Sequence, residues 1–184
     1  GNEDIGEAAL FIPAQHQAAT RLQIGGATLT FTSTGDAYFP HALVFVTDLF
    51  VPDLVSSLDK TVRNVTHPTG PLRRGDILEY TVSFKNSGQD GATRTTVRDP
   101  IPTHTAFVPG SLRVVSDDGR GIAGNNAPET DGAGDDVAEF DAAGNRVVFR
   151  VGAGANATGG GLLTSGQGAT LRFQVKVSDT APDT

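Results

Sequence analysis

Leu58-Asp-Lys60-Thr-Val62 begins the stretch of sequence that decides the fold, and the stretch ends at Gly110. Between these ends it contains, in order, Gly75-Asp76, Leu78-Glu-Tyr80-Thr-Val82-Ser-Phe84, Asn86-Ser87-Gly88, Val97-Arg-Asp99-Pro-Ile101-Pro102 and Phe107-Val108-Pro109-Gly110. Several of these segments alternate apolar and polar side chains, which is the period of a half-buried β-strand. The Asn-Ser-Gly and Pro-Gly steps between them favour turns. The stretch therefore predicts short strands joined by turns.

The same pattern continues along the rest of the chain, where helical periodicity is nearly absent. The strands it predicts are Ala9–Ile12, Thr20–Ile24, Thr28–Thr32, Leu43–Thr47, Ile77–Phe84, Thr93–Val97, Leu112–Val115, Arg146–Val151 and Thr170–Val177. Regularly spaced short strands with turn residues between them are typical of a β-sandwich. We expect an all-β fold, an immunoglobulin-like antiparallel β-sandwich preceded by a smaller strand-rich segment.

A domain boundary is predicted near Pro52-Asp53, because the dense apolar run Leu43–Phe50 ends there and the alternation restarts. Residues 1–53 then form a strand-rich N-terminal segment, and residues 54–184 the sandwich. About four strands are few for an independent sandwich. The segment is either the tail of a truncated domain or a set of strands that pair with the second domain or with a neighbouring molecule. Residues 116–141 are poor in apolar side chains and predict a long loop.

Composition excludes several classes of protein. The formal net charge is −7 and the Lys and Arg residues are scattered, which argues against nucleic-acid and anionic-membrane partners. No segment approaches the ~18 consecutive apolar residues of a membrane-spanning helix. Without Cys, the chain can form no disulfide, thiolate metal site or cysteine nucleophile. The chain starts without a signal peptide, so we expect a mature or trimmed piece of a longer protein.

Lys60, Asp99 and Asp179 each share the strand parity of apolar residues. Because side chains alternate between the two faces of a strand, residues of one parity point to one face. We therefore expect the three ionisable groups on core-facing positions of three strands, where a charge must pair, be neutralised or react. The apolar rows are, in chain order, Leu58 and Val62; Val97 and Ile101; and Leu171, Phe173, Val175 and Val177.

Three interpretations of these groups remain open. Lys60 and Asp179 could lie near strand ends and extend to solvent. Lys60 and Asp99 could form a buried ion pair. In the third interpretation, the Lys60 amine and the Asp179 carboxyl form an isopeptide bond, with protonated Asp99 as the catalytic acid that polarises the carbonyl. By the chain-entropy model such a cross-link would add about 4–5 kcal/mol to stability.

The motifs quoted above resemble, over residues 54–179, the conserved repeat domain of bacterial and archaeal surface proteins (domain of unknown function eleven). The resemblance implies an immunoglobulin-like sandwich in a secreted, often repetitive adhesin or stalk. The positions of Lys60 and Asp99 are also similar to those in pilin domains of Gram-positive bacteria, in which a first-strand Lys bonds to a last-strand Asn beside an Asp. This chain departs from that pattern, because Ser178-Asp179 stands where the Asn is expected.

Other residues that could bind or react form weaker patterns. Asp131, Asp135 and Asp136 are candidate calcium ligands in an Asp-rich loop, although a solvated acidic loop is the simpler interpretation and no EF-hand spacing is present. Two glycosylation sequons begin at Asn64 and Asn156. No nucleophile elbow or phosphate-binding loop is visible. The isolated histidines, which lack the paired spacing of a zinc site, are His16, His41, His67 and His104.

These patterns favour a non-enzymatic structural module of a secreted cell-surface protein, an adhesin stalk or an extracellular filament, with no cofactor. We expect its partners to be neighbouring domains or identical subunits, bound through β-strand edges, together with a host or matrix ligand. The alternative is a calcium-dependent adhesin module that binds carbohydrate or protein. A hydrolase is a third interpretation, which would need a convergent catalytic triad. In the first two cases the protein is extracellular.

Overall fold

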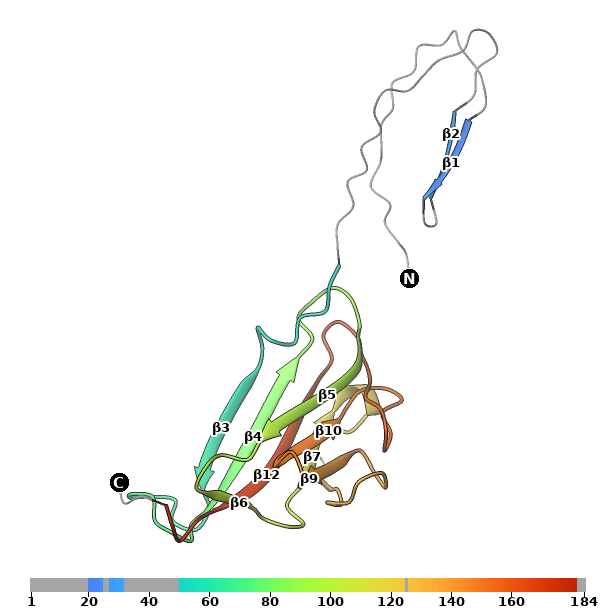
Figure 1. Ribbon diagram of the computed structural model, residues 1–184. Coiled ribbons are helices and arrows are strands. Elements are labelled where there is room, and N and C mark those ends of the chain that lie inside the picture. Colours follow the sequence, from blue (N-terminus) through green and yellow to red (C-terminus); the bar gives the residue numbers. More distant parts are fainter. Residues whose placement is uncertain (1–19, 25–26, 32–49, 125, 182–184) are drawn as a thin grey trace, which may run out of the picture. The chain divides into compact units, whose positions relative to one another are not determined.

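A computed structural model describes residues 20–24, 27–31, 50–124 and 126–181 (Figure 1). The chain divides into two compact units, Gly1–Leu49 and Phe50–Thr184. In the first unit β1 (Thr20–Ile24) pairs with the antiparallel β2 (Ala27–Phe31). These strands agree to within a residue with two predicted strands, whereas the predicted strands Ala9–Ile12 and Leu43–Thr47 lie outside the described residues.

The second unit consists of two antiparallel sheets, as shown in Figure 1. The larger sheet has the order β3-β4-β12-β7-β8, with β6 also paired to β12, and the smaller has the order β11-β5-β10-β9. The predicted all-β antiparallel sandwich is confirmed. Its strands are β3 (Asp59–Asn64), β4 (Ile77–Lys85), β5 (Ala92–Pro100), β6 (Thr105–Phe107), β7 (Arg113–Asp117), β8 (Ala127–Pro128), β9 (Ala138–Asp141), β10 (Arg146–Arg150), β11 (Gly161–Leu163) and β12 (Gly168–Val177).

The last strand lies in the middle of the larger sheet. β12 pairs with β4 from Gly168 to Lys176 on one side, and with β7 and β6 on the other. In an immunoglobulin constant domain the last strand instead lies in the sheet opposite the first two strands. Both arrangements therefore consist of two antiparallel sheets, but they differ in which sheet contains the last strand.

The alternation in β12 explains its central place. Leu171, Phe173 and Val175 are fully buried, and the residues between them are partly exposed. This strand supplies the longest apolar row of the core, which meets Phe149 and Leu163 of the smaller sheet. Burial of such side chains contributes about 1.5–3 kcal/mol each, so this row is a large share of the driving force for folding.

The prediction of one long loop over residues 116–141 is only partly right. The segment contains the end of β7, a single 3-10 turn (η1, Asp118–Arg120), β8 and β9. The polar composition places Asp117 in the loop, yet it is fully buried and its carboxylate accepts hydrogen bonds from the backbone N–H of Gly152. Backbone donors satisfy a buried carboxylate as well as water does, and composition alone does not reveal them.

No helix of the described segments is long and apolar enough to cross a membrane.

Asn86 holds together the segments at one end of the second unit. Its side chain is fully buried, and its Oδ1 accepts hydrogen bonds from the N–H groups of Asp53 and Gly88. Its Nδ2 donates to the carbonyls of Asp90 and Leu163. Gly88 is required beside it, because a Cβ there would lie 2.1 Å from the Val51 carbonyl oxygen. Besides forming a turn, the Asn-Ser-Gly segment therefore links the chain around Asp53, Asp90 and Leu163 through the Asn86 side chain.

Replacing Asn86 with Ala should lower the free energy of unfolding by about 2–4 kcal/mol, because the change leaves buried backbone donors and acceptors without partners. Asn86→Asp should also destabilise, since a carboxylate cannot donate to the Asp90 and Leu163 carbonyls. Urea denaturation followed by circular dichroism measures both. Gln89→Ala, an exposed amide in the same turn, is the matched control and should change stability by less than about 0.5 kcal/mol. Equal effects at the two positions would contradict the assignment.

Candidate functional site

The ion pair between Lys60 and Asp99 connects the two sheets. Lys60 lies on β3 of the larger sheet and Asp99 on β5 of the smaller one, and the Lys60 Nζ is 2.7 Å from the Asp99 Oδ1. Asp99 lies opposite the fully buried Val147 on β10. The carboxylate therefore points into the sandwich, and the lysine reaches it from the neighbouring sheet.

Aromatic rings of the core surround the ammonium group of Lys60. Its Nζ lies 4.7 Å from the centroid of the Tyr80 ring and 6.0 Å from that of Phe173. These two rings stack with centroids 5.3 Å apart. A cation over an aromatic face gains a further electrostatic attraction, so the two rings add to the attraction between the ammonium group and the Asp99 carboxylate.

Strand parity predicted the direction of Lys60 but overestimated its burial. Lys60 lies opposite the buried Val82, on the inner face of the larger sheet. The Lys60 side chain is nevertheless 38% exposed, against 11% for Asp99. Its row neighbours Leu58 and Val62 are also exposed, because β3 is an edge strand whose inner face the smaller sheet leaves uncovered.

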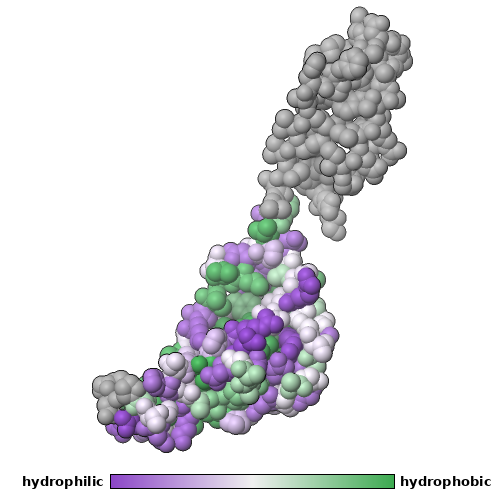
Figure 2. Space-filling view, viewed as in Figure 1, coloured by the Kyte–Doolittle hydropathy of each residue, from purple (hydrophilic) through white to green (hydrophobic). Residues whose placement is uncertain are grey.

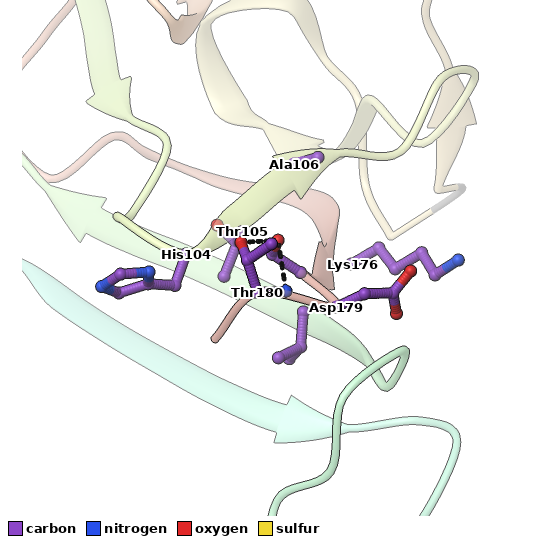
Figure 3. Close-up of a pocket in the computed structure, with 8 residues that line it drawn as sticks. His104, Thr105, Ala106, Lys176, Asp179 and Thr180 are labelled. Atoms are coloured by element: carbon purple, nitrogen blue, oxygen red, sulfur yellow. Dashed lines mark hydrogen bonds between the residues drawn. The ribbon is translucent and has the colours of Figure 1, made fainter. Parts of the chain in front are cut away.

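Asp179 does not join this pair. It follows the end of β12, is exposed, and lines a pocket of about 400 Å³ together with His104 and Lys176 (Figure 3). Lys60 lies level with Val82 and thus with Leu171, which is six residues before Val177 on β12. At a rise of ~3.3 Å per residue, Val177 is already about 20 Å away. The structure thus brings Lys60 to Asp99, as in the ion-pair interpretation, and leaves Asp179 at the far end of the strand.

The candidate calcium ligands accept hydrogen bonds from their own loop and, in the case of Asp131, from the turn before β7. Asp136 accepts from the Thr130 N–H, Asp135 from the Thr130 hydroxyl, and Asp131 from the Gly110 N–H. Among the described residues there is no group of three or more His, Asp or Glu side chains that could hold a metal ion. In this structure Asp131, Asp135 and Asp136 therefore accept hydrogen bonds that hold the surrounding backbone.

The sequon at Asn64 is part of a buried network centred on Asp76. The Asp76 carboxylate is only 1% exposed and accepts from the Asn64 Nδ2, at 2.6 Å, and from the Arg73 N–H. His67 Nδ1 lies 2.6 Å from its other oxygen. Burial alone would raise the pKa of Asp76, but the hydrogen bonds from His67, Arg73 and Asn64 outweigh it and lower the pKa below its usual value. The amide nitrogen of Asn64 is thus occupied.

Asn156, in the second sequon, lies in an exposed turn. Its Oδ1 accepts from the backbone N–H and the hydroxyl of Thr158 and from the Gly159 N–H. Of the isolated histidines, His104 lines the pocket near Asp179 and His67 contacts Asp76, whereas His16 and His41 lie outside the described residues.

A second network on the larger sheet was not predicted from the sequence. Glu79, on β4, binds the guanidinium groups of Arg63 and Arg172 and accepts from the Gln174 side chain. These residues lie on β3, β4 and β12, so the network runs across the outer face of the three strands. Cross-strand pairing of opposite charges is the signal that links them, but it becomes visible only once the strand order is known.

Comparison with known proteins adds little to this geometry. No family model matches the chain, so the resemblance to the surface-protein repeat domain rests on the quoted motifs. No curated protein matches it either. One solved structure, "Crystal structure of the RrgA Jo.In complex", is similar with 16% sequence identity and a TM-score of 0.40, over 72% of this chain and 67% of that chain. We draw no functional conclusion from a likeness this weak.

Removing the Lys60 charge should destabilise the protein, because it leaves the Asp99 carboxylate between the sheets without its cation. Lys60→Met keeps most of the aliphatic stem and should lower the free energy of unfolding by about 1–3 kcal/mol. Asp99→Asn should destabilise as well, and the double variant by less than the sum of the two, with a coupling of about 1 kcal/mol. Chemical denaturation provides these values. Lys176→Met, at an exposed lysine on β12, is the control.

Intact mass spectrometry distinguishes the ion pair from a covalent bond. The geometry predicts the mass of the unmodified sequence. A mass lower by one water, restored in Lys60→Met, would show an amide at Lys60 and contradict the ionic interpretation.

The Asp76 network should make stability depend on acid pH. A carboxyl whose pKa is lowered by folding stabilises the protein above its unfolded pKa of about 4, and this stabilisation is lost as the pH falls through the folded value. In the wild type, the urea concentration at the unfolding midpoint should therefore decrease as the pH is lowered below about 4. In Asp76→Asn, which we expect to be less stable at neutral pH, it should decrease less steeply. Parallel pH profiles for the two proteins would show that Asp76 is not the titrating group.

Proposed function

We propose that the second unit is a non-enzymatic structural module of an extracellular cell-surface protein, an adhesin stalk or a filament, that transmits tension along its strands. The observation that carries this proposal is the position of the first and last strands. β3 and β12 both pair antiparallel with β4, so they run parallel to each other with β4 between them (Figure 1).

This arrangement places the two ends of the unit at opposite ends of β4. The first residue of β3, Asp59, lies level with Ser83, near the end of β4. Val177, the last residue of β12, donates a backbone hydrogen bond to Asp76, immediately before β4 begins. Tension between the chain ends therefore acts along the strands and loads the hydrogen bonds of both ladders in shear. Many bonds must break together in shear, whereas an unzipping load breaks them one pair at a time.

The Lys60–Asp99 pair supports this role because it fastens the edge strand. β3 has only β4 as a sheet neighbour in the described part of the chain, and its inner face is partly exposed. The ion pair and the contact of Lys60 with Tyr80 and Phe173 tie β3 to the smaller sheet and to the core. Slippage of β3 along β4 would have to break these contacts as well as the ladder. Attachment to neighbouring domains or identical subunits through strand edges accords with the same role.

Single-molecule pulling in two directions tests the proposal. The chain has no native Cys, so engineered cysteines define the points of attachment. Handles at Val55→Cys and Thr180→Cys load β3, β4 and β12 in shear, whereas handles at Val55→Cys and Lys85→Cys peel β3 from β4 at one end. The first pair should give a clearly higher unfolding force, because rupture under load is governed by the unfolding barrier.

Adding Lys60→Met should lower the force for the first pair of handles. Equal forces in the two directions would contradict a module built to carry tension.

A further inference from the structure

We propose that β3 of one molecule pairs with β3 of a second copy, antiparallel and in one register, with Thr61 opposite Thr61. The larger sheets of the two molecules then continue into each other across a two-fold axis. This inference deepens the proposed structural role and rests on it, since it names an identical subunit as the partner of the edge strand and defines the contact.

β3 is the longest strand at an edge of either sheet of the second unit. The other strands with a single sheet neighbour, β6, β8, β9 and β11, are three, two, four and three residues long, against six for β3. Short edges are a common protection against pairing with other chains, and β3 lacks it. Among the residues that the structure describes, only β4 pairs with it.

The backbone groups that face this open edge can be identified. Val65 donates its N–H to the Ile77 carbonyl, at 2.9 Å, and hydrogen-bonded pairs in an antiparallel ladder recur at every second residue. Asp59, Thr61 and Arg63 therefore direct their backbone groups to β4. Lys60 and Val62 direct their N–H and carbonyl groups outwards, where an added strand can bind them.

The inner face of β3 also presents apolar surface. Leu58 and Val62 are 55% and 54% exposed, and Figure 2 shows apolar surface gathered where the chain leads into β3. Val55 in the preceding turn is exposed as well. Two β3 strands related by a two-fold axis perpendicular to the sheet keep these rows on the same face, so each copy shields part of the row of the other.

The backbone permits only registers in which outward-facing residues meet. Lys60 opposite Lys60 meets this condition but places like charges side by side, which is unfavourable. Val62 opposite Val62 also meets it, but it places Asp59 opposite Val65 and only diagonal to Arg63, so the two charges do not pair directly. Thr61 opposite Thr61 pairs Lys60 with Val62 of the second copy and places Asp59 opposite Arg63 in both halves of the contact. Charge therefore selects the third register.

The side chains that would meet are free to do so. Asp59 is exposed, and no described residue forms an ion pair or hydrogen bond with its carboxylate. Arg63 is 68% exposed and binds Glu79 through its Nε and Nη2, which leaves other N–H donors of the guanidinium for a second carboxylate. Lys60 is neutralised within its own chain by Asp99, so it adds no unpaired charge to the contact.

A charge-exchange experiment on the full chain tests the register. Sedimentation velocity over a range of concentrations should show wild-type dimers. Asp59→Arg places two cations opposite each other, and Arg63→Asp two anions, so each variant alone should dimerise at least about tenfold more weakly. In an equimolar mixture of the two variants, every cation of one copy meets a carboxylate of the other, so the mixture should associate as well as the wild type. The control is Asp179→Arg, which makes the same charge change at an exposed carboxylate away from β3.

A second measurement does not depend on Arg63, whose loss also removes a partner of Glu79. Thr61→Cys places two cysteines at a non-hydrogen-bonded pair, where the Cα atoms lie within disulfide range, and the chain has no other Cys. It should form a disulfide-linked dimer on mild oxidation, whereas Thr180→Cys should not.

Wild-type monomers at all concentrations, a mixture that stays monomeric, or equal cross-linking of the two cysteine variants would each overturn the proposal. These outcomes are independent of the pulling experiment, which concerns one molecule. A failed force measurement with successful charge exchange would reject the tension-bearing role and keep the interface.

Discussion

The pairing of β12 with β4 is the interaction on which the rest of the structure depends. The ladder spans residues 168–176 of β12, and the apolar face of that strand forms much of the core. Because β3 pairs with the other edge of β4, the entering and leaving strands are forced to run parallel. Close packing of the last strand between β4 and β7 means that the sandwich is complete only when β12 is in place.

The edge strand has a different kind of support. β3 buries little of its own surface and depends on contacts made by its polar side chains. Lys60 binds Asp99 across the gap between the sheets, and Arg63 binds Glu79 on the outer face. β3 leaves backbone groups open on the side away from β4 and apolar residues exposed on its inner face. A strand that is held in place on one side and open on the other is what we expect of a module that assembles through strand edges.

Alternation of side chains predicted β4, β5, β7, β10 and β12 and the direction of Lys60, because period two is a local property of the chain. It missed the short strands β6, β8, β9 and β11, which have two to four residues and are too short to show a period. It could not predict that Lys60 would be partly exposed, since burial depends on how far the opposite sheet extends. Parity alone groups Asp179 with Lys60, because parity fixes the face of a strand but not the position along it. The buried roles of Asn86 and Asp117 are invisible in the sequence because each depends on a backbone partner far away along the chain, Leu163 for Asn86 and Gly152 for Asp117. All three points depend on long-range properties of the fold: the extent of the opposite sheet, the register of the strands, and the backbone groups that folding brings to each side chain.

Native-state hydrogen exchange, followed residue by residue, tests the central place of β12 most directly. The account predicts that the amides of Leu171, Phe173 and Val175 exchange only through global unfolding, with the same free energy as those of Tyr80 and Val82 on β4. In dilute protein the Lys60 and Val62 amides, which face the open edge, should exchange much faster. Amides of β12 that exchange at a clearly lower free energy than those of β4 would show that the last strand detaches on its own, and would contradict the account.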